Sequence, residues 1–410
     1  MKYFLIFSLS VAISGCSTRE SAPVIWRNIE QSLQTQLITM NNGDTINLPE
    51  GYFMFTRGLD VTSKSNITIR GRGIEKTILS FKNQSEGAQG FLISQGSNIV
   101  LEDFSIEDAR GDNLKVSEVN GITLRRIRSA WTEGPKTENG AYALYPVLCK
   151  NVLMEECMAI GSSDAGIYVG QSDSVIIRNN KAYWNVAGIE SENSRWVEIY
   201  GNEAYDNTGG ILVFDLPGLT TYGHTTRLFG NTIHDNNLDN FATKGNVVAG
   251  IPAGTGVMIL ATHNLEMTEN KISNNKTVGT GIISYEIVVA LNQEEPNQGS
   301  GQGRVNNQYK KDSLYNPYPY QISIHHNQFE NSHWFPTMQN DIGKLLMMKS
   351  FGHPPDIAYD GIPDPARPDA EICIRDNGEI LVINLDAAND FKSLVKNPES
   401  LQCTGVKPRP

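Results

Sequence analysis

Short apolar strands that end in asparagine recur through the middle of the chain. The segment 175–180 (VIIRNN) is typical, because Val175 and Ile177 alternate with more polar positions, as in a strand with one buried face. A second asparagine follows at Asn185, and a glycine with a β-branched residue comes next at Gly188-Ile189. The unit returns at a spacing near 22 residues. This repetition predicts a solenoid whose rungs are made of strands.

The asparagines fall into two columns when the repeats are stacked. Equal positions of neighbouring rungs lie about 4.8 Å apart in a stacked parallel sheet, so each amide can hydrogen-bond to the next. Buried amides need such partners, and we interpret both columns as structural. The first column holds Asn180, Asn202, Asn231, Asn270 and Asn327, and the second holds Asn185, Asn207, Asn236 and Asn275.

The pattern changes at both ends of the repeats. Apolar residues at helical spacing between Asn28 and Met40 predict an amphipathic helix, which covers the open end of the solenoid. After Trp334 the repeat is lost, and 341–349 predicts a short helix at the far end. The expected fold class is all-β, a parallel β-helix solenoid with an N-terminal helical cap and a small C-terminal appendage.

Three rungs carry insertions. Segments 214–224 and 286–320 follow the third strand of a rung, the strand that begins at the glycine, and 237–255 follows the second strand. Long loops on a rigid scaffold usually carry function. We therefore look for the site beside them.

The first residues predict a secreted and anchored protein. Lys2 precedes an apolar run that is too short to span a bilayer and has the pattern of a signal peptide. The run ends in Ile13-Ser14-Gly15-Cys16, which resembles the bacterial lipobox, in which the cysteine becomes the lipidated N-terminus. Ser17 after the cysteine favours sorting to the outer membrane. We expect a lipid anchor in the cell envelope, with the protein exposed to the periplasm or the exterior.

These patterns give the expected domain limits. They are a lipoprotein signal peptide at 1–15, a lipid-anchor linker at 16–25, the parallel β-helix at 26–335, an end cap and linker at 336–370, and the C-terminal appendage at 371–410.

The net charge and the cysteines limit the kinds of partner and of compartment that we expect. The 410 residues carry a formal net charge of −11, so the basic footprint of a nucleic-acid-binding protein is absent. Cys373 and Cys403 lie in a segment without repeats, and we expect them to form a disulfide in an oxidising compartment. Cys157 takes the rung position of Asn180, so we expect a buried small side chain there.

Four segments carry a resemblance to known proteins. The segments are 138–142 (ENGAY), 164–172 (DAGIYVGQS), 186–190 (VAGIE) and 207–217 (NTGGILVFDLP). They resemble the right-handed parallel β-helix repeat proteins of bacterial envelopes, and in particular a lipoprotein family without a settled activity. The resemblance covers about 26–335 and implies the right-handed coil. The wider superfamily includes pectate lyases, alginate lyases, mannuronan epimerases, sugar hydrolases and periplasmic accessory proteins for copper sites.

The outward face of the third strands mixes aromatic and acidic residues. We expect one outward column at Tyr142, Tyr168, Glu190, Leu212, Met258 and Ile283, and a second at Leu144, Gly170, Glu192, Phe214, Leu260 and Tyr285. Such a surface suits a polysaccharide or cell-envelope glycan. The alternative is that the inserted loops fold over this face and bury it. The candidate catalytic residues are Tyr168, Glu190, Glu192, Asp215 and Lys136, and the candidate substrate-binding residues are Tyr142, Tyr145, Phe214 and Arg195.

Two reaction classes fit these residues. Glu190 and Glu192 lie two apart on a strand, about 6.5–7 Å between Cα atoms, and inverting glycosidases separate their carboxyl groups by about 6.5–9.5 Å. A lyase or epimerase instead needs a group that neutralises the uronate carboxylate and a base that takes the C5 proton. The candidates are Lys136, Tyr145, Tyr168, Arg195 and His263. We favour a lyase or epimerase over a hydrolase, although the Asp-Pro-His-Asp segment of mannuronan epimerases is absent.

A non-enzymatic function is the rival hypothesis. His224 and His263 each stand two residues before a first strand, so they should stack on adjacent rungs, and imidazole suits copper or zinc. The alternative to a metal site is a solvent-exposed corner, because Arg195, Asp173 and Lys150 continue the column with alternating charge. The rival is therefore a periplasmic scaffold or metal-site accessory protein that binds a divalent metal; the sequence names no cofactor.

Overall fold

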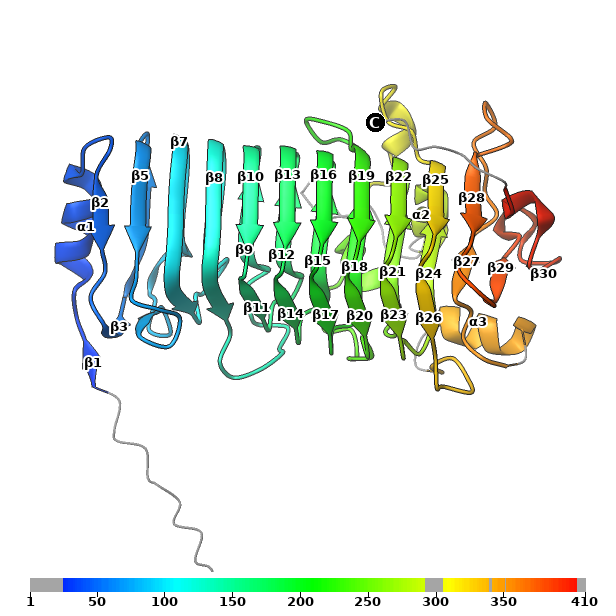
Figure 1. The fold of residues 1–410 in the computed structure, drawn as a ribbon, viewed down its shortest axis with the longest axis horizontal. Coiled ribbons are helices and arrows are strands. Elements are labelled where there is room, and N and C mark those ends of the chain that lie inside the picture. Colours follow the sequence, from blue (N-terminus) through cyan, green and yellow to red (C-terminus); the bar gives the residue numbers. More distant parts are fainter. Residues whose placement is uncertain (1–24, 292–304, 339–340, 351, 404–410) are drawn as a thin grey trace, which may run out of the picture.

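The computed structural model describes residues 25–291, 305–338, 341–350 and 352–403. Successive rungs of a parallel β-helix lie side by side along its long axis, with helix α1 (Glu30–Thr39) at the N-terminal end (Figure 1). Leu33 and Leu37 of α1 join the core that runs through the coil, so the expected helical cap is confirmed. Cys16 and the signal peptide lie outside the described residues. Among the described helices, none is long and apolar enough to cross a membrane.

Each rung contributes one strand to each of three parallel stacks. Two long strands, β7 (Glu86–Glu107) and β8 (Leu114–Ala130), run round corners and belong to all three. Besides these, the first-strand stack holds β2 (Thr45–Asn47), β5 (Ser65–Arg70), β10 (Lys150–Glu155), β13 (Asp173–Arg178), β16 (Arg195–Tyr200), β19 (His224–Phe229), β22 (His263–Thr268), β25 (Tyr320–His325) and β28 (Ile372–Arg375).

The second-strand stack is made of shorter strands. It holds β1 (Trp26–Arg27), β3 (Gly51–Met54), β6 (Thr77–Ser80), β11 (Met158–Ile160), β14 (Lys181–Tyr183), β17 (Glu203–Tyr205), β20 (Thr232–His234), β23 (Lys271–Ser273) and β26 (Gln328–Glu330).

The third-strand stack carries the face of interest. It holds β4 (Arg57–Thr62), β9 (Tyr142–Val147), β12 (Ala165–Gly170), β15 (Ala187–Glu192), β18 (Gly209–Phe214), β21 (Thr255–Leu260), β24 (Val278–Ile283), β27 (Ile357–Tyr359) and β29 (Val382–Asn384), and β30 (Val395–Lys396) joins it antiparallel.

The asparagine columns form continuous hydrogen-bonded ladders, as the sequence predicts. Asn202 is typical: its Oδ1 accepts from the backbone N–H and the Nδ2 of Asn180, at 2.9 and 3.0 Å. Its own Nδ2 donates to Asn231 Oδ1 at 3.0 Å and to the carbonyl of Ile177 at 2.9 Å. Cys157 donates its N–H to Asn180 and is buried, which confirms that it ends this column as a small side chain.

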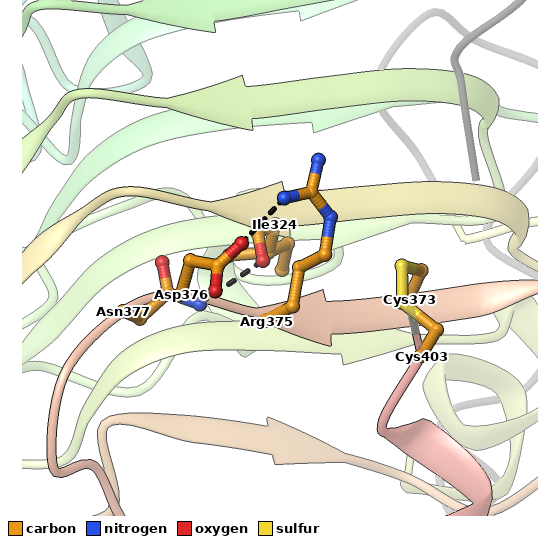
Figure 2. Close-up of a disulfide and its surroundings, with 6 residues drawn as sticks. All are labelled: Ile324, Cys373, Arg375, Asp376, Asn377 and Cys403. Carbon is orange, nitrogen blue, oxygen red and sulfur yellow. Dashed lines mark hydrogen bonds and ion pairs between the residues drawn. A yellow bond between two sulfur atoms is a disulfide. The ribbon is translucent and has the colours of Figure 1, made fainter. Parts of the chain in front are cut away.

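The coil continues beyond its expected end at residue 335. Strand β27 pairs in parallel with β24, and β28 pairs with β25. Asn377 extends the first asparagine column, because it accepts from Asn327 and donates to the carbonyl of Ile324 (Figure 2). The expected end of the coil at residue 335 is therefore wrong, because the segments 336–370 and 371–410 each contain a strand of the coil. Long insertions between the last rungs hide the 22-residue spacing, whereas the strand pairing persists.

The expected disulfide between Cys373 and Cys403 is present, with 5.4 Å between the Cα atoms (Figure 2). Cys373 lies in β28, a rung of the coil. The bond therefore fastens the C-terminal segment to the last rungs and does not staple a separate appendage.

Inserted segments cover the outward third-strand face near the C-terminal half. They are 215–223, 235–254 with a short 3₁₀ helix η1 (Val247–Gly250), 284–291 with α2 (Tyr285–Leu291), and 305–319 with η2 (Tyr309–Lys311). Helix α3 (Asp341–Ser350) joins them, and its Leu346 packs against Ile383 and Leu385. The expected helix at 341–349 is thus confirmed, although it lies on the side of the last rungs. These segments make a second apolar layer outside the coil.

Candidate functional site: buried carboxyl groups under the inserted segments

Strand pairing fixes the outward columns of the third-strand face. Tyr168 stands opposite Glu190, Glu190 opposite Leu212, and Leu212 opposite Met258. Gly281, not Ile283, follows Met258. The second column contains Val147, Gly170, Glu192, Phe214, Leu260 and Ile283.

The expected columns were shifted at both ends. Tyr142 stands opposite Ala165, and Leu144 stands opposite Ile167 inside the coil. Tyr145 therefore takes the column position that the sequence analysis gave to Tyr142, next to Tyr168. Alternation fixes the phase within a strand, but it does not fix how the strand pairs with its neighbour after a loop.

This face is covered, so it does not present a surface to a glycan in the structure. Tyr168 is 0% exposed and Glu190 is 2% exposed. Tyr142, Tyr145, Glu192 and Phe214 are buried as well, under residues of the inserted segments that include Val247, Ile251 and Tyr315. The expected open ligand surface is therefore wrong, and the alternative, burial by the loops, is confirmed. The tyrosines and glutamates are buried in the same way as Leu212 and Met258.

A hydrogen bond joins neighbouring strands at the centre of the cluster. The hydroxyl of Tyr168 on β12 donates to Glu192 Oε1 on β15 at 2.8 Å. The ring reaches Glu192 because Gly170, directly opposite Glu192, has no side chain: a Cβ there would lie 2.3 Å from the Tyr168 hydroxyl oxygen. Gly170 is thus required by the close approach of the Tyr168 ring.

Three tyrosines pack beside this hydrogen bond. The ring centroid of Tyr142 lies 4.4 Å from those of both Tyr145 and Tyr168. Tyr145 and Tyr168 meet edge to face at 5.0 Å, a favourable arrangement for aromatic rings. Lys115 Nζ lies 4.7 Å from the Tyr145 ring centroid, on the side of the earlier rungs. The rings close one end of the cluster.

Four carboxyl groups are buried next to the tyrosines: Asp164, Glu190, Glu192 and Asp215. Asp164 Oδ2 accepts from Asn246 Nδ2 of the covering segment 235–254 at 3.2 Å. Asp215 Oδ1 accepts from the backbone N–H of Gly223 at 2.8 Å. Glu190 Oε2 has no hydrogen-bond partner among the described residues. Within that part of the chain, none of the four carboxyl groups takes part in an ion pair.

Burial raises the pKa of every one of these acids. It raises the pKa of Asp164 to about 8, with a further contribution from the negative charge of Glu192. It raises the pKa of Glu192 to about 7, against the hydrogen bond from Tyr168, which lowers it. The pKa values of Glu190 and Asp215 are also raised well above the usual range, first by burial. At neutral pH the cluster therefore holds protons on carboxyl groups, a setting typical of general acids.

Other predicted site residues lie elsewhere. Lys136 is half-exposed and pairs with Glu133 at 2.5 Å. Arg195 pairs with Asp173 at 3.0 Å on the first-strand stack. Neither cation takes part in the carboxyl cluster. Sequence reasoning also missed Asp112, whose pKa burial raises to about 6 and which accepts from the N–H of Tyr142. Asp112 lies in the turn between β7 and β8, where the sequence has no periodic pattern that would mark it.

The two histidines stack as predicted. Their ring centroids are 5.8 Å apart, and His263 also stacks on Tyr320 at 4.5 Å. Burial lowers the pKa of His263 to about 4. In the part of the chain that the structure describes, no three His, Cys, Asp or Glu side chains are grouped to hold a metal ion, so no third donor joins the two imidazoles there.

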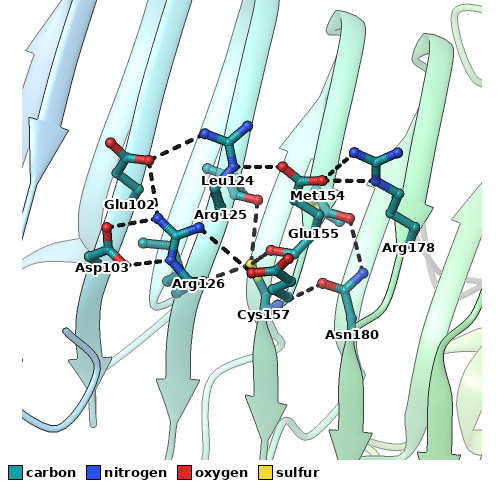
Figure 3. A network of polar contacts seen from close by, with 12 residues as sticks. Glu102, Asp103, Leu124, Arg125, Arg126, Met154, Glu155, Cys157, Arg178 and Asn180 are labelled. Atoms are coloured by element: carbon teal, nitrogen blue, oxygen red, sulfur yellow. Dashed lines mark hydrogen bonds and ion pairs between the residues drawn. The ribbon is translucent and has the colours of Figure 1, made fainter.

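A ladder of ion pairs lines the first-strand stack and was not predicted (Figure 3). Glu102 pairs with Arg70 at 2.5 Å and with Arg125 at 3.3 Å. Glu155 in turn pairs with Arg125 at 2.6 Å and with Arg178 at 2.5 Å. Arg70, Glu155 and Arg178 end their first strands, and Glu102 and Arg125 stand at the paired positions within β7 and β8. The stacking that aligns the asparagines therefore also gives this alternation of charge. The charges of the ladder pair with one another, so we interpret the ladder as a feature that stabilises the fold.

Comparison with known proteins supports the fold. The model of a right handed beta helix region matches residues 57–226. The A-module of the mannuronan C-5 epimerase AlgE4 of Azotobacter vinelandii aligns with a TM-score of 0.52 at 13% identity, over 85% of this chain and 89% of that one. The A-module of AlgE6 from the same organism gives 0.50 at 13% identity, over 86% and 90%. No curated protein matches the sequence. The chain is a right-handed parallel β-helix.

Proposed function

We propose that this protein acts on a glycan, with the buried carboxyl–tyrosine cluster as its acid–base site. The observation that carries the proposal is the burial of four carboxyl groups together, without an ion pair among the described residues. Burying such groups costs stability unless they are paired. Perturbed acids that are gathered in this way are typical of catalytic sites. The two β-helix structures named as mannuronan C-5 epimerases agree with a glycan as substrate.

The cluster supports glycoside cleavage better than the lyase or epimerase chemistry that the sequence favoured. A proton on Glu190 can go to the leaving oxygen, while Glu192, held by Tyr168, activates water. Their Cα atoms are about 6.5–7 Å apart along the strand, and we propose that their carboxyl groups lie at the separation of an inverting glycosidase. A uronate lyase or epimerase needs a cation near the sugar carboxylate. Lys136 and Arg195 are paired elsewhere, and Lys115 lies over the Tyr145 ring at the end of the cluster.

A glycan reaches these groups when the covering segment 235–254 moves. The hydrogen bond from Asn246 to Asp164 fastens that segment over the cluster, together with the apolar contacts of Val247 and Ile251. Closure of such segments excludes water during catalysis. We propose that 235–254 acts as the cover of the site.

The test is product analysis on a panel of acidic and neutral polysaccharides. Protein that starts at Ser17 is incubated in ¹⁸O-labelled water, and products are read by mass spectrometry. We expect one ¹⁸O atom per new reducing end, and a rate loss of about 10²–10⁴-fold in Glu190→Gln and Glu192→Gln. Glu198→Gln is the matched control, because Glu198 is exposed on the first-strand stack and pairs with Arg227. Unsaturated ends would refute cleavage by water, and an unchanged rate in Glu190→Gln would refute the site.

We also propose that the protein is anchored in the outer membrane through a lipid on Cys16. The support is the sequence Ile13-Ser14-Gly15-Cys16-Ser17. Wild-type protein expressed in a bacterium with labelled palmitate should carry the label and fractionate with outer membranes. Cys16→Ser should lose both properties. Wild-type protein without label would contradict the anchor and leave the proposed chemistry untouched.

A further inference from the structure

An apolar cavity of about 570 Å³ lies between the coil and its covering segments, next to the carboxyl cluster. Its floor is the third-strand face at Met258, Gly281 and Ala358, three consecutive members of one outward column. Its walls come from the segment 235–254, from α2 and from α3, for example through Leu346. Sequence positions that are distant along the chain thus enclose one space.

The cavity exists because the column loses its side chain at Gly281. The preceding rungs place Leu212 and Met258 at this position, and the next place Ala358 and Ile383. A Cβ built on Gly281 would meet nothing within 4 Å, and its backbone is not in the left-handed region that favours glycine. A larger residue could therefore stand there, and the space is left open by sequence and not by backbone geometry.

The lining selects an apolar ligand. Apart from Asp239, Asn240 and Asp341, the residues that line the cavity are glycine, proline or apolar, among them Phe214, Leu260 and Ile287. The cavity is partly open to solvent, and its apolar wall favours contact with apolar molecules over contact with water. The volume lies within the range of about 300–1,000 Å³ that is typical of ligand sites.

We propose that this cavity binds the hydrocarbon chain of a lipid whose head group carries no negative charge. The polar side chains in the lining decide the head group. Asp239 brings negative charge, whereas Asp341 is exposed and pairs with Lys344 at 2.9 Å. The amide of Asn240 already donates to the carbonyls of Val248 and Ile251. A carboxylate or phosphate head would meet like charge there, whereas a hydroxyl head can donate to an aspartate.

This site is distinct from the proposed catalytic cluster. Phe214 separates them, because it lines the cavity and stands directly opposite Glu192. Binding of a hydrocarbon chain therefore does not depend on the proposed chemistry.

The test is direct titration of the delipidated protein that starts at Ser17. Monopalmitoylglycerol and farnesol distinguish an acyl from an isoprenoid chain, palmitate supplies the anionic head, and binding is followed by native mass spectrometry and calorimetry. We expect one equivalent of an uncharged lipid to bind, and palmitate to bind more weakly. Absence of saturable binding by both uncharged lipids, or tighter binding of palmitate, would overturn the proposal.

A cavity-filling variant makes the test specific. Gly281→Leu places a side chain in the space and should weaken lipid binding at least tenfold, while the unliganded thermal midpoint stays equal or rises. Thr123→Leu is the matched control, because Thr123 is a half-buried outward position on the first-strand stack, between Val100 and Leu153. It should bind as the wild type does. Unchanged binding by Gly281→Leu, or a lower midpoint, would show that the cavity is not the site.

Discussion

At the scale of single residues, the asparagine columns were predictable and the burial of the acids was not. An asparagine at a fixed rung position has one physical role, since its amide must be paired when it is buried. Glu190 and Glu192 are correctly placed on the outward third-strand face by alternation alone. Their burial depends on Val247 and Ile251, which follow in an insertion with no periodicity, so the sequence could not show it.

Asn202→Ala tests the ladder. The change leaves the buried N–H of Asn180 without its acceptor and the carbonyl of Ile177 without its donor. Each orphaned group costs about 1–3 kcal/mol, so we expect the free energy of unfolding to fall by about 2–5 kcal/mol, measured by denaturant titration. Asn307→Ala is the control at an exposed position. Equal stability of the two variants would contradict the ladder's role.

At the scale of elements, the repeat pattern predicted strands well and register poorly. The three insertions were recognised because the spacing between rungs lengthens there. The pairing of β9 with β12 was shifted, because Tyr142 and Tyr145 are both aromatic and the loop between the rungs leaves the alignment open. The last rungs were missed for the same physical reason: β27 and β28 follow long insertions, and only the pairing with β24 and β25 identifies them.

At the scale of the whole molecule, a rigid coil supports a second layer that encloses both proposed sites. The core inside the coil is continuous, whereas the layer outside is assembled from segments that leave the coil at different rungs. The positions of these segments are predictable from the sequence, whereas the carboxyl cluster and the apolar cavity that they enclose are not. The carboxyl cluster and the apolar cavity arise where they meet the same face.

The buried acids give the whole protein a pH-dependent stability. Asp164 has a pKa of 3.8 when exposed and about 8 in the folded state. Between these values the folded state holds a proton that the unfolded chain has released, so the contribution of Asp164 to the free energy of unfolding is full below about pH 4 and is lost as the pH rises to about 8. His263 acts oppositely, because its pKa is lowered from 6.5 to about 4 in the folded protein.

Thermal unfolding of wild type and Asp164→Asn across pH tests whether these carboxyl groups are enclosed together without a counter-ion from the described residues. The variant keeps an acceptor for Asn246 and removes one titrating group, so the difference between the two curves cancels the contribution of His263. We expect the wild-type midpoint to fall relative to that of Asp164→Asn from about pH 5 to about pH 8, and the difference to stay constant above. Curves that run parallel over this range would mean that Asp164 titrates as an exposed acid, and the enclosed acid–base site would be refuted.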